Sequence, residues 1–171
     1  YIRLGISSTK VLAKMACDNF AKKNKTGIFL LPKDDIPEIL WPLEVHKMFM
    51  VGSKMTHHFS QMGIYTIGDI AQRELGKFKQ QMRSRFGKQS DIQAELYWRI
   101  ANGIDDSEVT LGTHDTQKSI GHMMTLPRDY RTQNEIFTVI LELSELVCQH
   151  CRAKGYMGWV VSVGLMGADY D

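Results

Sequence analysis

The order of apolar and polar residues predicts a strand, a helix and a second strand in the first part of the chain. Residues 1–6 and 27–31 are short apolar runs, which are typical of buried strands. Between them, residues 9–22 predict an amphipathic helix, which Ser7 or Ser8 is expected to cap. The apolar side chains of this helix recur at helical spacing and predict its buried face: Val11, Leu12, Met15, Ala16 and Phe20.

Residues 34–102 predict a compact module of short helices. Thr66 is expected to cap one of these helices and to leave the side chains of Ile67 and Ile70 pointing inward. Residues 74–86 predict a lysine- and arginine-bearing helix that Gly87 ends. The apolar residues that mark the last two helices are Leu75, Phe78 and Met82, and then Ile92, Leu96, Tyr97, Trp98 and Ile100.

Residues 45–64 have the pattern of a helix-hairpin-helix. A short apolar run is followed by a tight turn at Gly52-Ser53 and by a second helix, which starts near Lys54 and ends at Gly63. The first N–H groups of a helix have no partner inside it, so they can bind a phosphate without reading a base. An ordinary packing unit of two helices is the simpler interpretation of this stretch taken alone.

The pattern changes in the last third of the chain. Residues 105–116 are polar and aperiodic, as expected of a tether between domains. Residues 117–126 and 158–165 predict strands on either side of a helix at 134–151, which makes a βαβ-type unit. Two strands make a poor sheet, so this domain is expected to continue past residue 171. The predicted apolar face of the helix consists of Ile136, Val139, Ile140, Leu143, Leu146, Val147 and Cys151.

Composition limits the possible functions. The net charge is only +2, so any nucleic-acid site must be a local patch. No apolar run approaches the ~18 residues of a membrane span, and no secretion signal opens the chain. The three cysteines fit no disulfide framework, and the pair Cys148 and Cys151 is interpreted as core packing. We therefore expect a cytoplasmic protein without a membrane partner.

Charged residues suggest one candidate cluster and exclude another. On the first long helix, Asp18 can pair with a lysine on either side. The charged residues that recur along this face of the helix form either a solvated face with ion pairs or a set of cations directed at phosphates. Asp34 and Asp35 are expected to cap a short helix rather than to bind a metal, so no metal ligand is assigned. The charged residues of this helix face, spaced four residues apart, are Lys10, Lys14, Asp18 and Lys22.

Several stretches taken together resemble the Y-family of translesion DNA polymerases, in particular the UmuC/UvrX-type branch of Gram-positive bacteria and their mobile elements. They follow the family's order and spacing over almost the whole chain. The matching stretches are residues 4–18, Met50-Val-Gly-Ser-Lys-Met-Thr56 with residues 62–64, residues 101–105, and residues 118–121 with 125–130. The chain begins with a predicted strand already under way and stops just past another, so we expect a fragment of a longer protein.

The resemblance implies an α+β fold made of several pieces. A strand–helix–strand piece of the late palm comes first, followed by a small all-helical thumb that carries the helix-hairpin-helix. A tether then leads to a partial βαβ-type little-finger domain. The implied boundaries are 1–31 for the palm, 32–104 for the thumb, 105–116 for the tether and 117–171 for the truncated little finger.

The resemblance also implies roles for individual residues. Lys22 matches a lysine that contacts the incoming nucleotide, and Lys14 matches a family lysine with either a structural or a nucleotide-binding role. Met50 stands where the family usually has glycine, so the turn is expected to be reshaped or its grip weakened. Residues 113–116 replace frequent cations, which lowers the expected DNA affinity. The implied DNA-binding residues are Val51, Gly52, Ser53, Lys54 and Thr56 in the hairpin, and Lys118, Ser119, Gly121 and Thr125 in the little finger.

The implied function is that of the DNA-gripping portion of an error-prone lesion-bypass polymerase, active in DNA repair and the SOS response. The parent enzyme would use Mg²⁺ held by carboxylates that precede this chain, so the chain alone is not expected to polymerise. Its implied partners are primer–template DNA, the incoming dNTP, and a sliding clamp or a recombinase. Two alternatives remain open: a stand-alone helix-hairpin-helix module without catalysis, and a protein-interaction domain that docks through residues 134–151.

Overall fold

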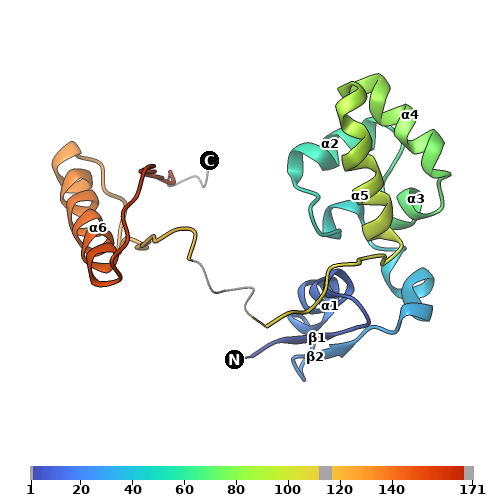
Figure 1. Ribbon diagram of the computed structural model, residues 1–171, viewed down its shortest axis with the longest axis horizontal. Helices are drawn as coiled ribbons and strands as arrows, with labels where there is room; N and C mark the ends of the chain where they lie inside the picture. Colours follow the sequence, from blue (N-terminus) through green and yellow to red (C-terminus); the bar gives the residue numbers. More distant parts are fainter. Residues whose placement is uncertain (1, 112–116, 168–171) are drawn as a thin grey trace. The chain divides into compact units, whose positions relative to one another are not determined.

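A computed structural model describes residues 2–111 and 117–167. The contacts divide the chain into two compact units, Tyr1–Val109 and Thr110–Asp171, which we describe separately. The first unit contains both strands found in the described residues and five α-helices (Figure 1). The predictions made for Tyr1 and for residues 113–116 lie outside the described part.

The first unit opens with the predicted strand, helix and strand. β1 (Leu4–Ile6) pairs in parallel with β2 (Ile28–Leu30). The crossover between them contains α1 (Lys10–Ala16), which continues as a π-helical turn, Cys17–Ala21. The prediction of the cap was wrong, because Thr9 caps α1 by accepting a hydrogen bond from the Leu12 N–H. The hydroxyl group of Ser7 instead donates to the carbonyl oxygen of Leu31, 2.6 Å away.

Helix α1 covers one face of this small sheet at very short range. Leu12, Met15 and Ala16 are fully buried in the core of the first unit, as their spacing predicted, whereas Val11 and Phe20 of the same predicted face are partly buried. A Cβ atom on Gly5 would lie 2.2 Å from the carbonyl oxygen of Ala13 and 2.4 Å from the backbone nitrogen of Cys17. Only glycine therefore fits where β1 meets this helix.

The middle of the first unit is helical, as predicted, but its first pieces are single turns. The expected helix near Asp34 is a 3₁₀ turn followed by a π-helical turn, and neither Asp34 nor Asp35 forms the predicted capping bond. The elements in chain order are 3₁₀ Lys33–Asp35, π-helical Ile36–Leu40, 3₁₀ Val45–Lys47, α2 (Ser53–Gln61), α3 (Ile67–Ala71), α4 (Leu75–Phe86), 3₁₀ Lys88–Ser90 and α5 (Asp91–Ala101).

The core of this helical part is built around aromatic and aliphatic side chains from each helix. Phe59 of α2 packs edge-on against Tyr97 of α5, with ring centroids 5.3 Å apart. Thr66 and Asp69 form a reciprocal capping box at the start of α3, which buries Ile67 and Ile70 completely as predicted.

The buried face of α5 differs from the residues that predicted the helix. Ile92 is 83% exposed and Leu96 is 40% exposed. Of the residues that marked this helix, Tyr97 and Ile100 are buried as expected, and two alanines, Ala94 and Ala101, complete the buried face. The periodicity therefore predicted the helix correctly, whereas three-dimensional packing selected which stripe is covered.

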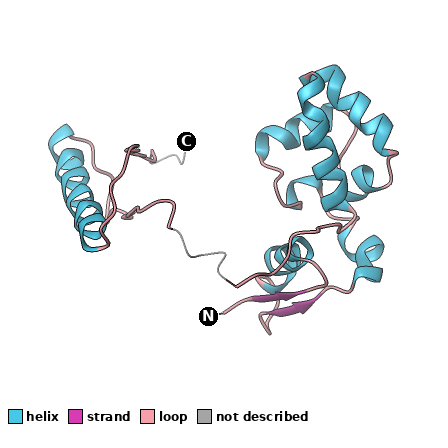
Figure 2. Ribbon diagram, viewed as in Figure 1, coloured by secondary structure: helices cyan, strands magenta, loops and turns pink. Residues whose placement is uncertain are grey.

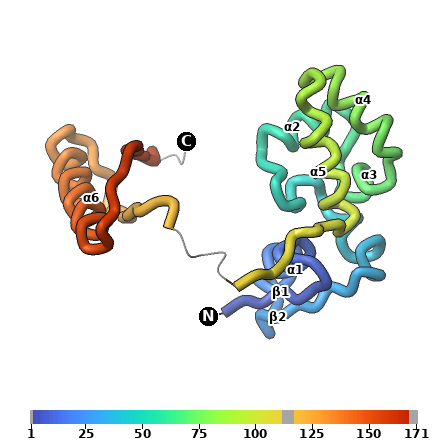
Figure 3. The backbone as a smooth tube through the Cα atoms, viewed as in Figure 1, coloured from blue at the N-terminus to red at the C-terminus, as the bar shows by residue number. Residues whose placement is uncertain are grey.

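After α5 the chain returns to α1, a path that Figure 3 traces. The Val11 N–H donates to a carboxylate oxygen of Asp105 over 3.2 Å, and the hydroxyl group of Thr9 contacts the carbonyl oxygen of Gly103. The other Asp105 oxygen accepts bonds from the amide and hydroxyl groups of Ser107, and these bonds lower the pKa of Asp105. The first residues of the predicted tether are thus attached to the first unit.

The second unit contains one long helix, α6 (Gln133–Ala153). The seven apolar residues predicted to share a face of this helix are all half-buried. No residue of α6 is fully buried. The prediction of strands at 117–126 and 158–165 was wrong, since the described residues of this unit form loops there (Figure 2). A strand needs a neighbouring strand to satisfy its backbone groups, and the described part of this unit supplies none.

Candidate nucleic-acid interface

The bend before α2 lies on the surface of the first unit. Gly52, Ser53 and Lys54 are exposed, while Val51 is buried beneath them. A Cβ atom on Gly52 would meet nothing within 4 Å, so the space in front of the bend is open. The bend therefore has the accessibility that a backbone contact to a ligand requires.

The first N–H groups of α2 have no partner among the described residues. Gly52 occupies the N-cap position and offers no side-chain oxygen to them. The first bond back into the turn comes from the Thr56 N–H, which donates to the Gly52 carbonyl over 2.9 Å. Partial positive charge at this helix end and the exposed ammonium group of Lys54 make the bend attractive to an anion.

Met50 has a backbone conformation that is unfavourable for a residue other than glycine. Its φ angle is +72°, and Met50 is the single non-glycine residue with a positive φ in the described part of the chain. The turn therefore keeps a left-handed residue at this position despite the side chain, rather than avoiding it. Such a conformation costs about 1–2 kcal/mol for a residue with a Cβ atom.

Replacing Met50 with glycine is expected to stabilise the chain by up to about 1 kcal/mol. Relief of the left-handed strain exceeds the extra entropy that glycine adds to the unfolded chain. Urea unfolding followed by circular dichroism measures the difference. Met50→Ala is the matched control, because it removes the same side chain and keeps the strain. Equal stabilities of the two variants would contradict this explanation.

A shallow depression adjoins the bend and contains residues that the sequence analysis did not select. It is lined by the predicted residues Val51, Ser53 and Thr56, together with His46, His57 and Ser60. Nδ1 of His46 lies 3.0 Å from a carboxylate oxygen of Glu44. In the sequence, the histidines next to the turn were the signal that could have pointed to this depression, since imidazole is a polar group that commonly contacts phosphate when protonated.

The predicted nucleotide-binding lysines lie together on one face of α1 and its π-helical extension. Asp18 lies between them, with its carboxylate 2.7 Å from the ammonium group of Lys14 and 2.5 Å from that of Lys22. These contacts, first with Lys14 and then with Lys22, lower the pKa of Asp18, and Asp18 in turn raises the pKa of Lys22. Both lysines remain about half exposed, and two ammonium groups with one carboxylate give the cluster a net charge of about +1.

The second set of predicted DNA-binding residues lies in the loop that precedes α6. Lys118, Ser119, Gly121 and Thr125 are all exposed. The Gln117 side chain connects this loop to the end of α6, because its amide oxygen accepts a bond from Lys154 over 2.7 Å. The two candidate DNA-binding groups thus belong to different units.

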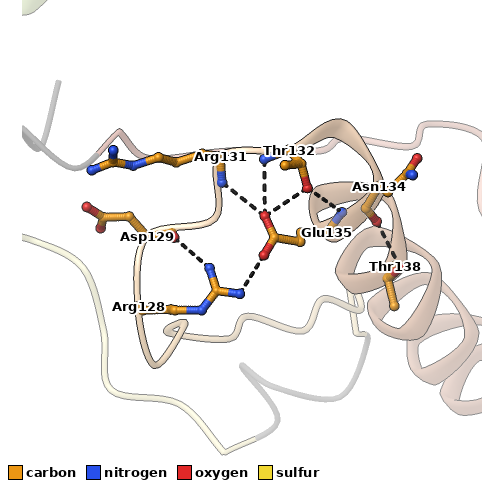
Figure 4. A network of polar contacts seen from close by, with 7 residues as sticks. All are labelled: Arg128, Asp129, Arg131, Thr132, Asn134, Glu135 and Thr138. Carbon is orange, nitrogen blue, oxygen red and sulfur yellow. Dashed lines mark hydrogen bonds and ion pairs between the residues drawn. The ribbon is translucent and has the colours of Figure 1, made fainter.

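The stretch 125–130, part of the family resemblance, is tied to the start of α6 by a polar network (Figure 4). Glu135 accepts bonds from the backbone and side chain of Thr132 in a capping box and from the guanidinium group of Arg128. Arg128 also lies over the Tyr130 ring, 4.6 Å from its centroid. The pKa of Glu135 is lowered to about 2, most strongly by the hydrogen bond from Arg128 and then by the hydrogen bonds from Thr132.

The first turn of α6 is expected to loosen in acid. The folded-state pKa of Glu135 lies below its ordinary value of 4.5, so the stabilisation is complete above pH 4.5 and is lost as the pH falls towards 2. Carbon-detected NMR titration of the Glu135 carboxyl, together with amide exchange of the first turn, measures this. Glu135→Gln should loosen the turn at neutral pH, whereas Glu142→Gln in the middle of α6 should not. An unshifted Glu135 titration would contradict the network.

The described residues offer no site that fits the Mg²⁺ implied by the resemblance. In residues 2–111 and 117–167, no three His, Cys, Asp or Glu side chains come together in a group that could hold a metal ion. We therefore assign no metal ligand.

Among the helices of the same residues, none is both long and apolar enough to cross a membrane.

Comparison with known proteins shows the family to which the chain belongs. The impB/mucB/samB family C-terminal domain matches residues 117–171. The whole chain is 51% identical to a region of DNA polymerase IV 2 of Bacillus subtilis. A DNA repair protein homolog of the same organism, YobH, is 33% identical over 163 residues, which is 95% of this chain and 71% of that protein. The chain belongs to the Y-family of DNA polymerases.

These matches confirm the resemblance to the Y-family that the sequence motifs indicated, and they include a UvrX protein. The putative UV-damage repair protein UvrX of Bacillus subtilis is 34% identical over 95% of this chain. The chain spans about 40% of the length of DNA polymerase IV 2 of Bacillus subtilis and 36–39% of most other relatives of this kind. Among solved structures, DinB from Sulfolobus solfataricus is a distant likeness, with 20% identity over 58% of this chain and 26% of that one and a TM-score of 0.43.

Proposed function

We propose that this Y-family chain is the DNA-gripping portion of an error-prone lesion-bypass DNA polymerase. In the whole enzyme it would hold primer–template DNA by its backbone, without regard to sequence. The observation that carries the proposal is the exposed bend at Gly52, where N–H groups that have no partner in the described part of the chain lie beside Lys54. Contacts of this kind fix the position of a duplex and carry no sequence information.

The two candidate groups would bind phosphates in different ways. The Gly52 bend would offer amide donors in a fixed geometry at the end of α2, which favours a single well-placed phosphate. Lys118, with Ser119, Gly121 and Thr125, would contact a further stretch of backbone from the second unit. Because the net charge is only +2, affinity would depend on these local contacts rather than on a general field.

Lys22 would contact the triphosphate of the incoming nucleotide, with Lys14 beside it. Asp18 holds both ammonium groups, so a triphosphate would have to compete with this carboxylate for them. The parent enzyme would be a DNA-directed DNA polymerase that uses Mg²⁺ to activate the primer hydroxyl group. It would act in the cytoplasm in the response to DNA damage, together with a sliding clamp or a recombinase.

Titration of the chain with labelled primer–template DNA over a range of salt concentrations tests the proposal. We expect log K to fall linearly with log salt, with a slope of roughly −2 to −4 for a few neutralised phosphates. Scrambling the DNA sequence should leave both affinity and slope unchanged. Fluorescence anisotropy measures both quantities. Binding that is insensitive to salt, or that prefers one sequence, would reject backbone gripping.

A further inference from the structure

Asn19 is a buried polar side chain that the proposed function does not use. It is 8% exposed and lies in the π-helical turn Cys17–Ala21 that extends α1. Its side-chain nitrogen donates to the carbonyl oxygen of Lys47 over 3.1 Å. This bond joins residues that are 28 positions apart, so it connects the N-terminal strand–helix–strand piece directly to the segment that leads into the hairpin.

The π-helical turn explains how Asn19 reaches that segment. The Lys22 N–H donates to the carbonyl oxygen of Cys17, five residues earlier, over 3.0 Å. The wider turn changes the direction of the side chains relative to a regular α-helix. Asp18, on the same turn, points to the two lysines on the surface, whereas Asn19 points inward to Lys47.

Lys47 ends the 3₁₀ turn Val45–Lys47, three residues before the strained Met50. A left-handed non-glycine residue persists only where its surroundings hold the chain on both sides. On the far side, the Val51 N–H donates to the carbonyl oxygen of Met48 over 3.2 Å, and Val51 is buried. On the near side, buried Val45 and the Asn19 bond fix the turn.

We propose that Asn19 is a positioning residue for the hairpin. By holding the carbonyl group of Lys47, it supports the left-handed Met50 and thereby presents the amide groups of Ser53 and Lys54 to a phosphate. This inference rests on the proposed function, because it assumes that the Gly52 bend binds DNA. It also implies that the lysine-bearing turn and the DNA-binding bend form one rigid arrangement within the first unit.

The test is a double-mutant cycle between Asn19 and Met50 in the 171-residue chain. Asn19→Ala should weaken primer–template binding about fivefold, the usual effect of one lost hydrogen bond. In a Met50→Gly background the same change should weaken binding less than twofold, because glycine adopts the left-handed conformation without support. NMR amide shifts of Gly52, Ser53 and Lys54, recorded without DNA, should move in the single variant.

Asn102→Ala is the matched control. The Asn102 side-chain nitrogen also ties two distant segments of the first unit, since it donates to the carbonyl oxygen of Ala71 over 3.2 Å. We expect this variant to lose stability and to keep its DNA affinity. If Asn19→Ala lowers affinity equally in both backgrounds, or shifts no hairpin amide, Asn19 has only a structural role and the inference fails. Asn19→Ser serves as the second variant if the alanine chain does not fold.

The outcomes also separate this inference from the proposed function. If Gly52→Val abolishes binding while Asn19→Ala leaves it unchanged, the bend binds DNA and the role of Asn19 is rejected. If the unaltered chain does not bind DNA, the proposed function fails, and the positioning role fails with it. Binding that drops in Gly52→Val and in Asn19→Ala, with rescue by Met50→Gly, supports both.

Discussion

Replacing Gly52 with valine is expected to weaken primer–template binding by about 10- to 100-fold for every DNA sequence. This factor corresponds to the loss of one hydrogen bond to a charged group. The φ and ψ angles of Gly52 are −91° and 177°, which valine adopts readily, and its Cβ atom would meet no protein atom within 4 Å. The chain should therefore fold, and the branched side chain should block only the approach of a phosphate.

Two further substitutions make this result specific. Gly76→Val places the same side chain on exposed α4 in the same unit, and we expect it to leave DNA affinity unchanged. Gly52→Ser introduces a hydroxyl group that can accept from the free amides of α2, so it should raise stability slightly and still weaken binding. Anisotropy titrations and urea unfolding measure both effects. Unchanged affinity in the Gly52 variants would remove the hairpin from the interface.

Replacing Gly5 with alanine is expected to destabilise the first unit by about 3 kcal/mol or more. The new Cβ atom would lie within 2.4 Å of backbone atoms of both Ala13 and Cys17. Backbone atoms cannot rotate away as a side chain can, so α1 must move off the sheet and expose buried Leu12 and Met15. A loss of this size should lower the melting temperature by at least about 12 °C.

The control for Gly5 is another glycine of the same unit. Gly76→Ala lies in the exposed first turn of α4, where alanine is still a better helix former than glycine, and it should stabilise by up to about 1 kcal/mol. Differential scanning calorimetry of the two variants measures opposite shifts. A melting temperature for Gly5→Ala within a few degrees of the unaltered chain would show that α1 can be displaced at little cost.

Features set by residues three or four positions apart could be predicted from the sequence. The cap that Thr66 provides for α3, the face of α6 and the pairing of Asp18 with its neighbouring lysines are all of this kind. Each depends on the geometry of one helix turn, which the local sequence determines almost alone. The position of α2 and the exposed bend before it also followed from local turn signals.

Features that depend on distant contacts could not be predicted in this way. The bond from Asn19 to Lys47 needs a π-helical turn that has no clear sequence signature. The positive φ of Met50 contradicts its local preference, and the surrounding structure imposes it. Exposed Ile92 shows the same limit, since the helix pattern cannot tell which side the neighbouring helices will cover.

The predicted strands at 117–126 and 158–165 failed for a related reason. A run of apolar residues indicates that a segment is able to form a strand, but pairing requires a second segment alongside. In the described residues of the second unit the segments lie as loops, with Trp159 98% exposed and Val161 90% exposed. Strand propensity is therefore present in the sequence without the partner that would use it.

The uncovered run at 158–165 has a practical consequence for work with this chain. It contains no charge and no proline, and it is rich in valine, which is the composition of segments that stack between molecules as cross-β ribbons. Copies at high concentration can pair through it, and such aggregates would scatter light and distort the anisotropy of the labelled DNA. Light scattering at each protein concentration, and titrations kept dilute, therefore become part of every affinity measurement on this chain.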